Sequence, residues 1–252
     1  MLHKHLLAFC IISLFYLAGC ANFGKKAADA ADIYTQLGLR YLSMNKLDMA
    51  KENLQKALAK DSSNAQAYNG LAFLYEKLKK PQEAKHYYEK ALDLDPEDLG
   101  VQNNYGRFLC DQRQFDKGLA YLKQASSTPL NNRPWLAMTN TGRCYTLMGQ
   151  PHKAEPYFQQ ALALDDTYAP ALAEMQRMSY ERNDFPAAEQ YLQRYLATAE
   201  HTPETLWIAI HTERALGNHQ IATEYQNLLL KNFPLSEEAN KIKAVMWQQP
   251  NN

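Results

Sequence analysis

Two groups of neighbouring carboxylates are the residues best placed for acid–base chemistry. Asp93 and Asp95 lie two positions apart, and Asp165 and Asp166 are adjacent. Paired acidic side chains supply the proton donor and acceptor of many enzymatic reactions. Both groups lie, however, in turns between segments with helical periodicity, where aspartate caps the helix that follows. We therefore interpret them as structural residues.

The histidines and the known chemical motifs give no sign of a metal site or a nucleophile. After residue 19, no two histidines are three or four positions apart, so no helical face would present a pair of them to a metal ion. The sequence also lacks His-Glu-x-x-His, Cys-x-x-Cys, glycine-rich phosphate-loop and Gly-x-Ser-x-Gly motifs. We expect no metal, no cofactor and no catalytic residue, and we expect His201 and His211 to face solvent.

The N-terminus has the features of a secretory signal. Lys4 precedes an apolar run of about a dozen residues that ends at Leu17. A transmembrane helix needs roughly 20 apolar residues, so this run is too short to span a bilayer. Two small residues then lead to Cys20. The segment is either an ordinary signal peptide with a chance cysteine at the cut, or a signal cleaved so that Cys20 accepts lipid.

The sequence Leu-Ala-Gly-Cys that ends at Cys20 resembles the lipobox of bacterial lipoproteins, and we favour that interpretation. The resemblance implies a signal peptide over 1–19, lipid attachment at Cys20 and a lipidated tether over 20–30. Several acyl chains anchor a protein far more firmly than one, since each buried methylene contributes about 0.8 kcal/mol. Ala21 stands where lipoproteins of the inner membrane carry aspartate. The resemblance therefore implies the periplasmic face of the outer membrane of a Gram-negative bacterium.

The composition favours a helical chain without affinity for nucleic acid. Once residues 1–19 are removed, acidic residues outnumber basic residues by one, so no excess of positive charge is available for a phosphate backbone. Alanine, leucine, glutamine and glutamate are abundant, while glycine and proline are few. This balance favours helix over strand.

The chain repeats itself every 34 residues. Gly38 and Ala50 are followed 34 positions later by Ala72 and Ala84, and the surrounding residues match the tetratricopeptide repeat (TPR) pattern. Small residues at these positions let the two helices of a hairpin approach closely, and the larger residues fill the space around them.

The repeat register predicts an all-α fold, a right-handed superhelix of about six TPR hairpins with a C-terminal capping helix. The small residue recurs at Gly106 and, after a two-residue insertion, at Gly142, whereas Gln176 stands there in the fifth unit. The predicted superhelix covers 31–235, and a capping helix and tail cover 236–252. Its six units lie near 31–64, 65–98, 99–134, 135–168, 169–202 and 203–235.

Two further cysteines lie beyond the predicted lipid acceptor. The repeat register places Cys110 and Cys144 on neighbouring helices, in a compartment where disulfides are permitted. We favour a disulfide between them, which would add roughly 3–4 kcal/mol to stability on the chain-entropy model. Two independently buried thiols are the alternative.

A repeat array of this kind presents a concave surface lined by the first helix of each hairpin. In the first two units, Leu39, Leu42 and Phe73 occupy positions that usually face this surface, and they predict an apolar floor for a partner segment. The alternative is that these three pack against the tether or a neighbouring helix. The polar residues expected to orient a partner are Thr35, Asn69, Asn103 and Arg107.

One segment is more specific than the general repeat pattern. The third unit carries Asn-Asn-Tyr-Gly-Arg-Phe-Leu-Cys over 103–110 and Phe-Asp-Lys-Gly over 115–118. Together with Ile-Tyr-x-x-Leu-Gly-Leu-x-Tyr-Leu over 33–42, this segment resembles the PilF/PilW family of type IV pilus biogenesis and stability lipoproteins. The resemblance covers nearly the whole chain and agrees with a count of six units, although the fifth unit departs from the repeat pattern.

The resemblance implies a pilotin, a lipoprotein without catalytic activity. Such a protein binds subunits of the type IV pilus secretin in the periplasm and, through its lipid, helps carry them to the outer membrane, where they form the pore for the pilus. Some members instead stabilise assembled fibres against retraction. The resemblance implies a protein partner and an outer-membrane anchor, with no small-molecule substrate. Two alternatives are a general TPR adaptor, docking cell-wall enzymes or the outer-membrane protein assembly machinery, and a periplasmic enzyme.

Overall fold

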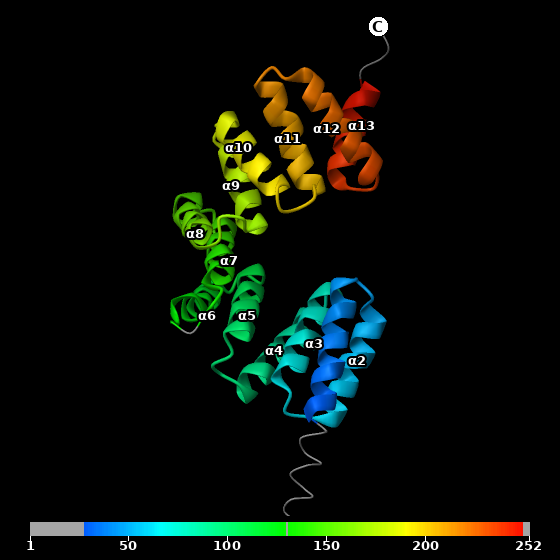
Figure 1. Cartoon of the computed structure of the whole chain (residues 1–252), viewed down its shortest axis with the longest axis vertical. Coiled ribbons are helices and arrows are strands. Elements are labelled where there is room, and N and C mark those ends of the chain that lie inside the picture. Colours follow the sequence, from blue (N-terminus) through cyan, green and yellow to red (C-terminus); the bar gives the residue numbers. More distant parts are fainter. Residues whose placement is uncertain (1–27, 130, 249–252) are drawn as a thin grey trace, which may run out of the picture. The chain divides into compact units, whose positions relative to one another are not determined.

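The computed structural model of the chain describes residues 28–129 and 131–248, and every regular element in these residues is a helix (Figure 1). None of the helices in this part of the chain is long and apolar enough to cross a membrane. A first helix covers residues 28–43. It is followed by α2 (Leu47–Lys60), α3 (Ala65–Lys77), α4 (Pro81–Leu94), α5 (Leu99–Asp111), α6 (Phe115–Ser127), α7 (Pro134–Leu147), α8 (Pro151–Leu164), α9 (Ala169–Glu181), α10 (Phe185–Leu196), α11 (Pro203–Ala215), α12 (His219–Asn232) and α13 (Glu237–Gln248).

The chain divides into two compact units between Tyr105 and Gly106. Each of the six predicted repeats contains two of the helices, and α13 packs on α11 and α12 at the end of the second unit. Residues 28–30, which we assigned to the tether, are already helical. The predicted signal peptide and Cys20 lie outside the described residues.

The helices of a hairpin meet at small residues. A methyl group on Gly118 of α6 would lie 2.7 Å from the carbonyl oxygen of Gly106 and 2.5 Å from the sulfur of Cys110. A methyl group on Gly142 of α7 would lie 2.6 Å from the ring of Phe158, which is completely buried. All three distances are shorter than van der Waals contact, so any side chain at these positions would force the helices apart in a closely packed interior.

The turn inside each hairpin contains one residue in the left-handed backbone conformation. These residues have φ between +56° and +82°, and they recur with the spacing of the repeat itself, at Asn45, Lys79, Arg113, Gly149, Asn183 and Gly217. Glycine adopts this conformation freely and asparagine tolerates it, whereas lysine and arginine are strained. The repeat therefore fixes the turn geometry even where the residue type opposes it.

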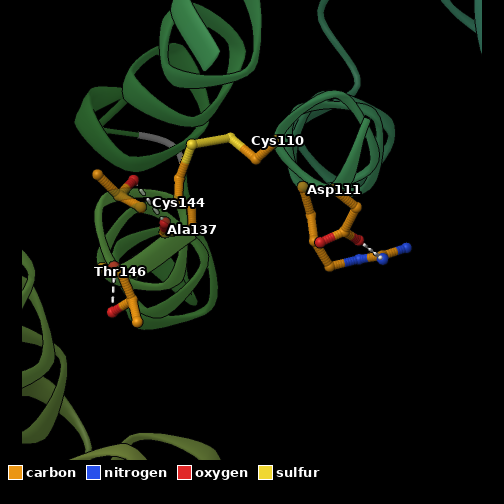
Figure 2. Close-up of a disulfide and its surroundings, with 8 residues drawn as sticks. Cys110, Asp111, Ala137, Cys144 and Thr146 are labelled. Carbon is orange, nitrogen blue, oxygen red and sulfur yellow. Dashed lines mark hydrogen bonds and ion pairs between the residues drawn. A yellow bond between two sulfur atoms is a disulfide. The ribbon is translucent and has the colours of Figure 1, made fainter. Parts of the chain in front are cut away.

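A disulfide joins two of the repeats. Cys110 of α5 and Cys144 of α7 are bonded through their sulfur atoms, with their Cα atoms 5.4 Å apart (Figure 2). Both cysteines are almost completely buried in a cluster with Leu122, Ala125 and Ala137. The bond links the first helices of two consecutive repeats across a sequence separation of 34 residues.

We predict that removing this crosslink destabilises the fold. Because the disulfide restricts the unfolded chain over a loop of this length, the double variant Cys110→Ala/Cys144→Ala should lose about 3–4 kcal/mol of unfolding free energy. Urea unfolding followed by circular dichroism measures the loss. Dithiothreitol should lower the urea midpoint of the unchanged protein and leave that of the variant where it is. Equal midpoints for both proteins without reductant would contradict the prediction.

A second prediction concerns the left-handed turns. Apart from the two neighbours of Gly149 in the chain, no residue has an atom within 4 Å of a methyl group placed there, so Gly149→Ala tests the backbone conformation alone. This variant should lose about 1 kcal/mol of unfolding free energy in the same urea experiment. Lys79→Gly, at the equivalent turn of the second repeat, should instead gain up to about 1 kcal/mol. If the unfolding free energy changed with the same sign in both variants, strain in the left-handed turns would not be the cause of the changes.

Candidate partner-binding surface

Two apolar side chains stand exposed on the first helices of two consecutive repeats. Leu39 of the helix over 28–43 and Phe73 of α3 are each 38% exposed. Leu39 lies over Gly70, because a methyl group on Gly70 would approach its Cδ2 to 3.1 Å. Phe73 follows Gly70 by one helical turn, and the Lys77 ammonium lies 5.3 Å from the centre of its ring. Leu39 and Phe73 are called the apolar patch below.

Polar side chains link the same helices from repeat to repeat. Asn64 donates to Asp32 Oδ1 at 3.1 Å, and Asn104 of α5 donates to Asn69 Oδ1 at 3.2 Å. A third link runs from the amide of Gln66 to the carboxylate of Asp98. The partners are 32 to 35 residues apart in the sequence. The first of these bonds joins the start of α3 to the helix over 28–43, so it links the two helices that carry the apolar patch, and the other two bonds join α3 to the next repeat.

Two residues predicted to line the groove are buried instead. Leu42 is 2% exposed and packs in the core with Leu54, and Thr35 is 4% exposed and donates its hydroxyl to the Ala31 carbonyl oxygen at 2.9 Å. The positions of Ala31, Thr35, Gly38 and Leu42 fall on one face of a helix, and Gly38 places that face against α2. Thr35 and Leu42 therefore offer almost no surface to a partner, contrary to the expectation that they line an exposed groove.

The other polar residues predicted to line the groove differ in their exposure and in their hydrogen-bond partners. Asn69 is 8% exposed and holds Asn104, so it orients its neighbour and offers little surface itself. Asn103 is partly exposed on α5 in the first unit. Arg107 belongs to the second unit, where its Nη1 donates to Asp111 Oδ2 at 2.9 Å.

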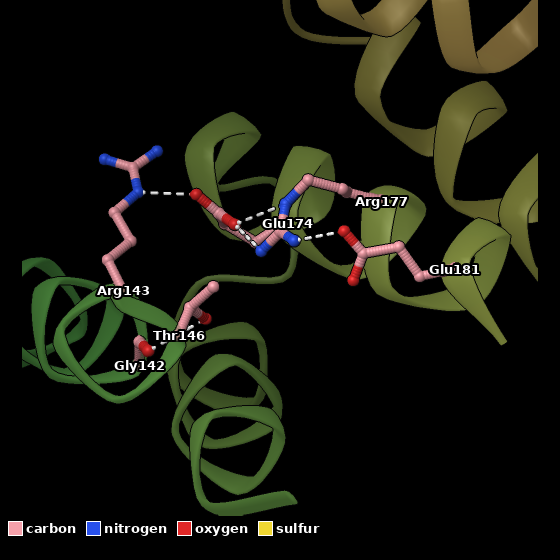
Figure 3. A network of polar contacts seen from close by, with 6 residues as sticks. All are labelled: Gly142, Arg143, Thr146, Glu174, Arg177 and Glu181. Carbon is pink, nitrogen blue, oxygen red and sulfur yellow. Dashed lines mark hydrogen bonds and ion pairs between the residues drawn. The ribbon is translucent and has the colours of Figure 1, made fainter. Parts of the chain in front are cut away.

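The second unit contains a polar cluster that the sequence analysis missed. Glu174 of α9 accepts from Arg143 Nε at 2.7 Å and from Arg177 Nη2 at 2.8 Å, and Arg177 Nη1 donates to Glu181 at 2.6 Å (Figure 3). Burial lowers the pKa of Arg177, but its hydrogen bond to Glu174 and the charges of Glu174 and Glu181 outweigh burial and raise that pKa above its ordinary value. The sequence contains a pattern that could have indicated this cluster, because arginine recurs at the same repeat position at residues 107, 143 and 177.

The expectation that His201 and His211 face solvent is wrong. Both rings are partly buried, His201 against Tyr225 and His211 with its centre 4.3 Å from that of Trp207. Burial lowers the pKa of His201, and burial together with Arg214 lowers the pKa of His211. Within the described residues, no group of three or more His, Cys, Asp or Glu side chains is placed to hold a metal ion.

Comparison with protein families confirms the repeat architecture. Models described as tetratricopeptide repeat match residues 65–98, 97–167 and 145–205, and a model described as TPR repeat matches 38–79. Together with the helices described above, these matches confirm the prediction of an all-α tetratricopeptide-repeat fold.

Individual relatives point to one process. The type IV pilus assembly protein PilF of Pseudomonas aeruginosa is 29% identical over 236 residues, which cover 90% of this chain and 94% of that protein. A solved structure of P. aeruginosa PilF covers 87% of this chain and 99% of its own at a TM-score of 0.70. The crystal structure of PilW, described as a widely conserved type IV pilus biogenesis factor, is 30% identical and covers 84% of this chain and 97% of its own, also at 0.70.

Structural similarity without sequence identity says less about function than the matches to PilF and PilW do. A chain of the APC/C heterotetramer Cut9–Hcn1 reaches a TM-score of 0.72 at 17% identity, and this chain covers 44% of it. That likeness reflects the shared fold, because stacked helical hairpins serve many functions. The sequence identity to PilF and PilW over nearly their full lengths is what distinguishes them.

Proposed function

This chain belongs to the PilF/PilW family of type IV pilus biogenesis proteins, and on that premise we propose that it is a pilotin. In this proposal it binds the pilus secretin through the apolar patch and promotes the assembly of secretin subunits in the outer membrane. The exposure of Leu39 and Phe73 on adjacent first helices is the observation that carries the proposal.

The apolar patch has the properties of a protein-binding site. Its two side chains present apolar surface on the first helices of neighbouring repeats, and the hydrogen bond from Asn64 to Asp32 joins the start of α3 to the helix over 28–43. A few large apolar side chains framed by polar groups carry most of the affinity in many protein interfaces. An apolar segment of the secretin would cover the patch and exclude water from it.

The membrane part of the proposal rests on the sequence. We propose that Cys20 carries lipid and holds the protein on the periplasmic face of the outer membrane, since the preceding Leu-Ala-Gly matches a lipobox and Ala21 is not aspartate. A lipid anchor would confine both protein and secretin to one surface. Confinement raises the effective concentration of subunits for one another and so favours assembly.

The apolar patch can be tested with two leucines of one helix. Leu39→Asp places a charge in the proposed interface and should reduce capture of purified secretin at least about ten-fold. Leu37→Asp is the matched control, because Leu37 is 37% exposed but points to a different side of the helix. Both variants should keep the helical circular dichroism of the unchanged protein. If Leu39→Asp captured as much secretin as the unchanged protein, or if both variants lost capture equally, the apolar patch would be excluded as the secretin-binding site.

The anchor can be tested separately from the patch. Cys20→Ala should abolish labelling by radioactive palmitate, release a folded soluble protein and lower the number of assembled secretin rings. Ala21→Asp is the control, because it keeps the acceptor cysteine while the lipobox resemblance predicts retention in the inner membrane. Secretin rings in normal number alongside fully soluble Cys20→Ala protein would mean that the anchor is dispensable.

A further inference from the structure

The first helix of the first repeat has a second exposed apolar face, which does not carry the apolar patch. Ile33 is 59% exposed and Leu37 is 37% exposed. Residues three and four positions apart share one face of a helix, so Arg40, which is also exposed, extends this face by one turn. Leu39 lies about 200° around the helix from Leu37. Ile33, Leu37 and Arg40 are called the edge face below.

The same three repeat positions are buried in every later repeat. In the second repeat they hold Ala67, Leu71 and Leu74, which pack in one cluster with Leu54 of α2. In the last three repeats, α7, α9 and α11 likewise pack on the second helix of the preceding hairpin. No hairpin precedes the first one in the described residues, so the edge face occupies an interface position without its usual partner.

The residue types of the edge face fit a membrane surface. A terminal repeat that faces water needs a polar outer side, yet Ile33 and Leu37 are apolar. Helices that lie in a membrane interface combine large apolar side chains with arginine or lysine, whose long stems let the charge reach the phosphates. A second copy of the chain on this face would instead bury Arg40, and burial of an unpaired charge is costly.

The proposed lipid anchor lies close to the edge face in the sequence. Residue 28, the first described residue of the helix, follows Cys20 by eight residues, which span at most about 29 Å when fully extended. Lys25 and Lys26 lie in this stretch, and basic residues beside an anchor are attracted to anionic phospholipids. A lipid on Cys20 would therefore keep the first hairpin next to the membrane.

We propose that the edge face lies against the phospholipid surface that holds the anchor, with Ile33 and Leu37 at the boundary between headgroups and acyl chains and Arg40 on the phosphates. This inference rests on the lipid anchor of the proposed function and adds an orientation to it. Because Leu39 lies on the opposite side of the same helix, the apolar patch then faces away from the membrane and stays open to the secretin.

The experiment places the environment-sensitive label nitrobenzoxadiazole on Leu37→Cys or Leu39→Cys of the full lipoprotein, in vesicles of phosphatidylethanolamine and phosphatidylglycerol. Only the introduced cysteine reacts, because the proposed lipid occupies Cys20 and a disulfide joins Cys110 to Cys144. Nitroxide-labelled phospholipid should quench the label at position 37 by at least about half and the label at position 39 by no more than about a tenth. The two positions are a matched pair, since Leu37 and Leu39 are 37% and 38% exposed.

A charge within the edge face should weaken its contact with lipid. Ile33→Asp should lower the quenching of the label at position 37 at least about two-fold, because a carboxylate is costly to bury among acyl chains. Ile33 is exposed, so the variant should keep the helical circular dichroism of the unchanged protein. Unchanged quenching in this variant would contradict the proposal.

The remaining outcomes separate this proposal from the anchor. Equal quenching at positions 37 and 39, in vesicles that retain the protein, would overturn the proposal and leave the anchor intact. So would a label at position 37 that is shielded from aqueous iodide in the unlipidated Cys20→Ala chain without vesicles, since the chain itself or a second copy would then cover the edge face. If the protein did not float with the vesicles, the anchor would fail and the proposal with it. The vesicles contain no secretin, so none of these outcomes depends on the apolar patch.

Discussion

The two helices of a hairpin can pack only where small residues let their backbones approach closely, and the burial of the larger side chains follows from this approach. At Gly118 a single added methyl group would collide with the backbone of Gly106, and at Gly142 it would collide with the ring of Phe158. Because the helices can approach this closely, the large side chains between them, such as Leu54 and Leu122, become completely buried. The same approach fixes the rotation of each first helix, and hence which of its residues remain outside.

The rotation of the first helices and the repetition of the hairpin together place the exposed side chains of both units. In the first unit, the same repeat position carries Leu39 and then Phe73, and the hydrogen bond from Asn64 to Asp32 joins the start of α3 to the helix over 28–43. In the second unit, that position carries Arg143 and then Arg177, which share Glu174. One repeat position thus supplies an apolar patch in one unit and two arginines of a polar cluster in the other.

The sequence predicted what depends on local spacing and missed what depends on distant neighbours. The 34-residue period identified the helices, the small residues between them and the helix pair that brings Cys110 and Cys144 together. It could not place Leu42, because a general rule for groove positions ignores how Gly38 turns this particular helix toward α2. The burial of His211 arises from Trp207 on its own helix and from Tyr180 of α9, so it depends on how α9 and α11 pack. The left-handed turn at Lys79 follows from the repeat, since the residue type opposes it.

Photocrosslinking in living cells can detect whether the face that carries Phe73 binds the secretin. A benzoylphenylalanine would replace Phe73 in one strain and Gln55, an exposed residue of α2, in another, in bacteria that assemble pili with this protein. We expect a covalent adduct with the secretin from position 73 and none from position 55. An adduct from position 55 alone, or none from position 73 in cells with secretin rings in normal number, would contradict this expectation.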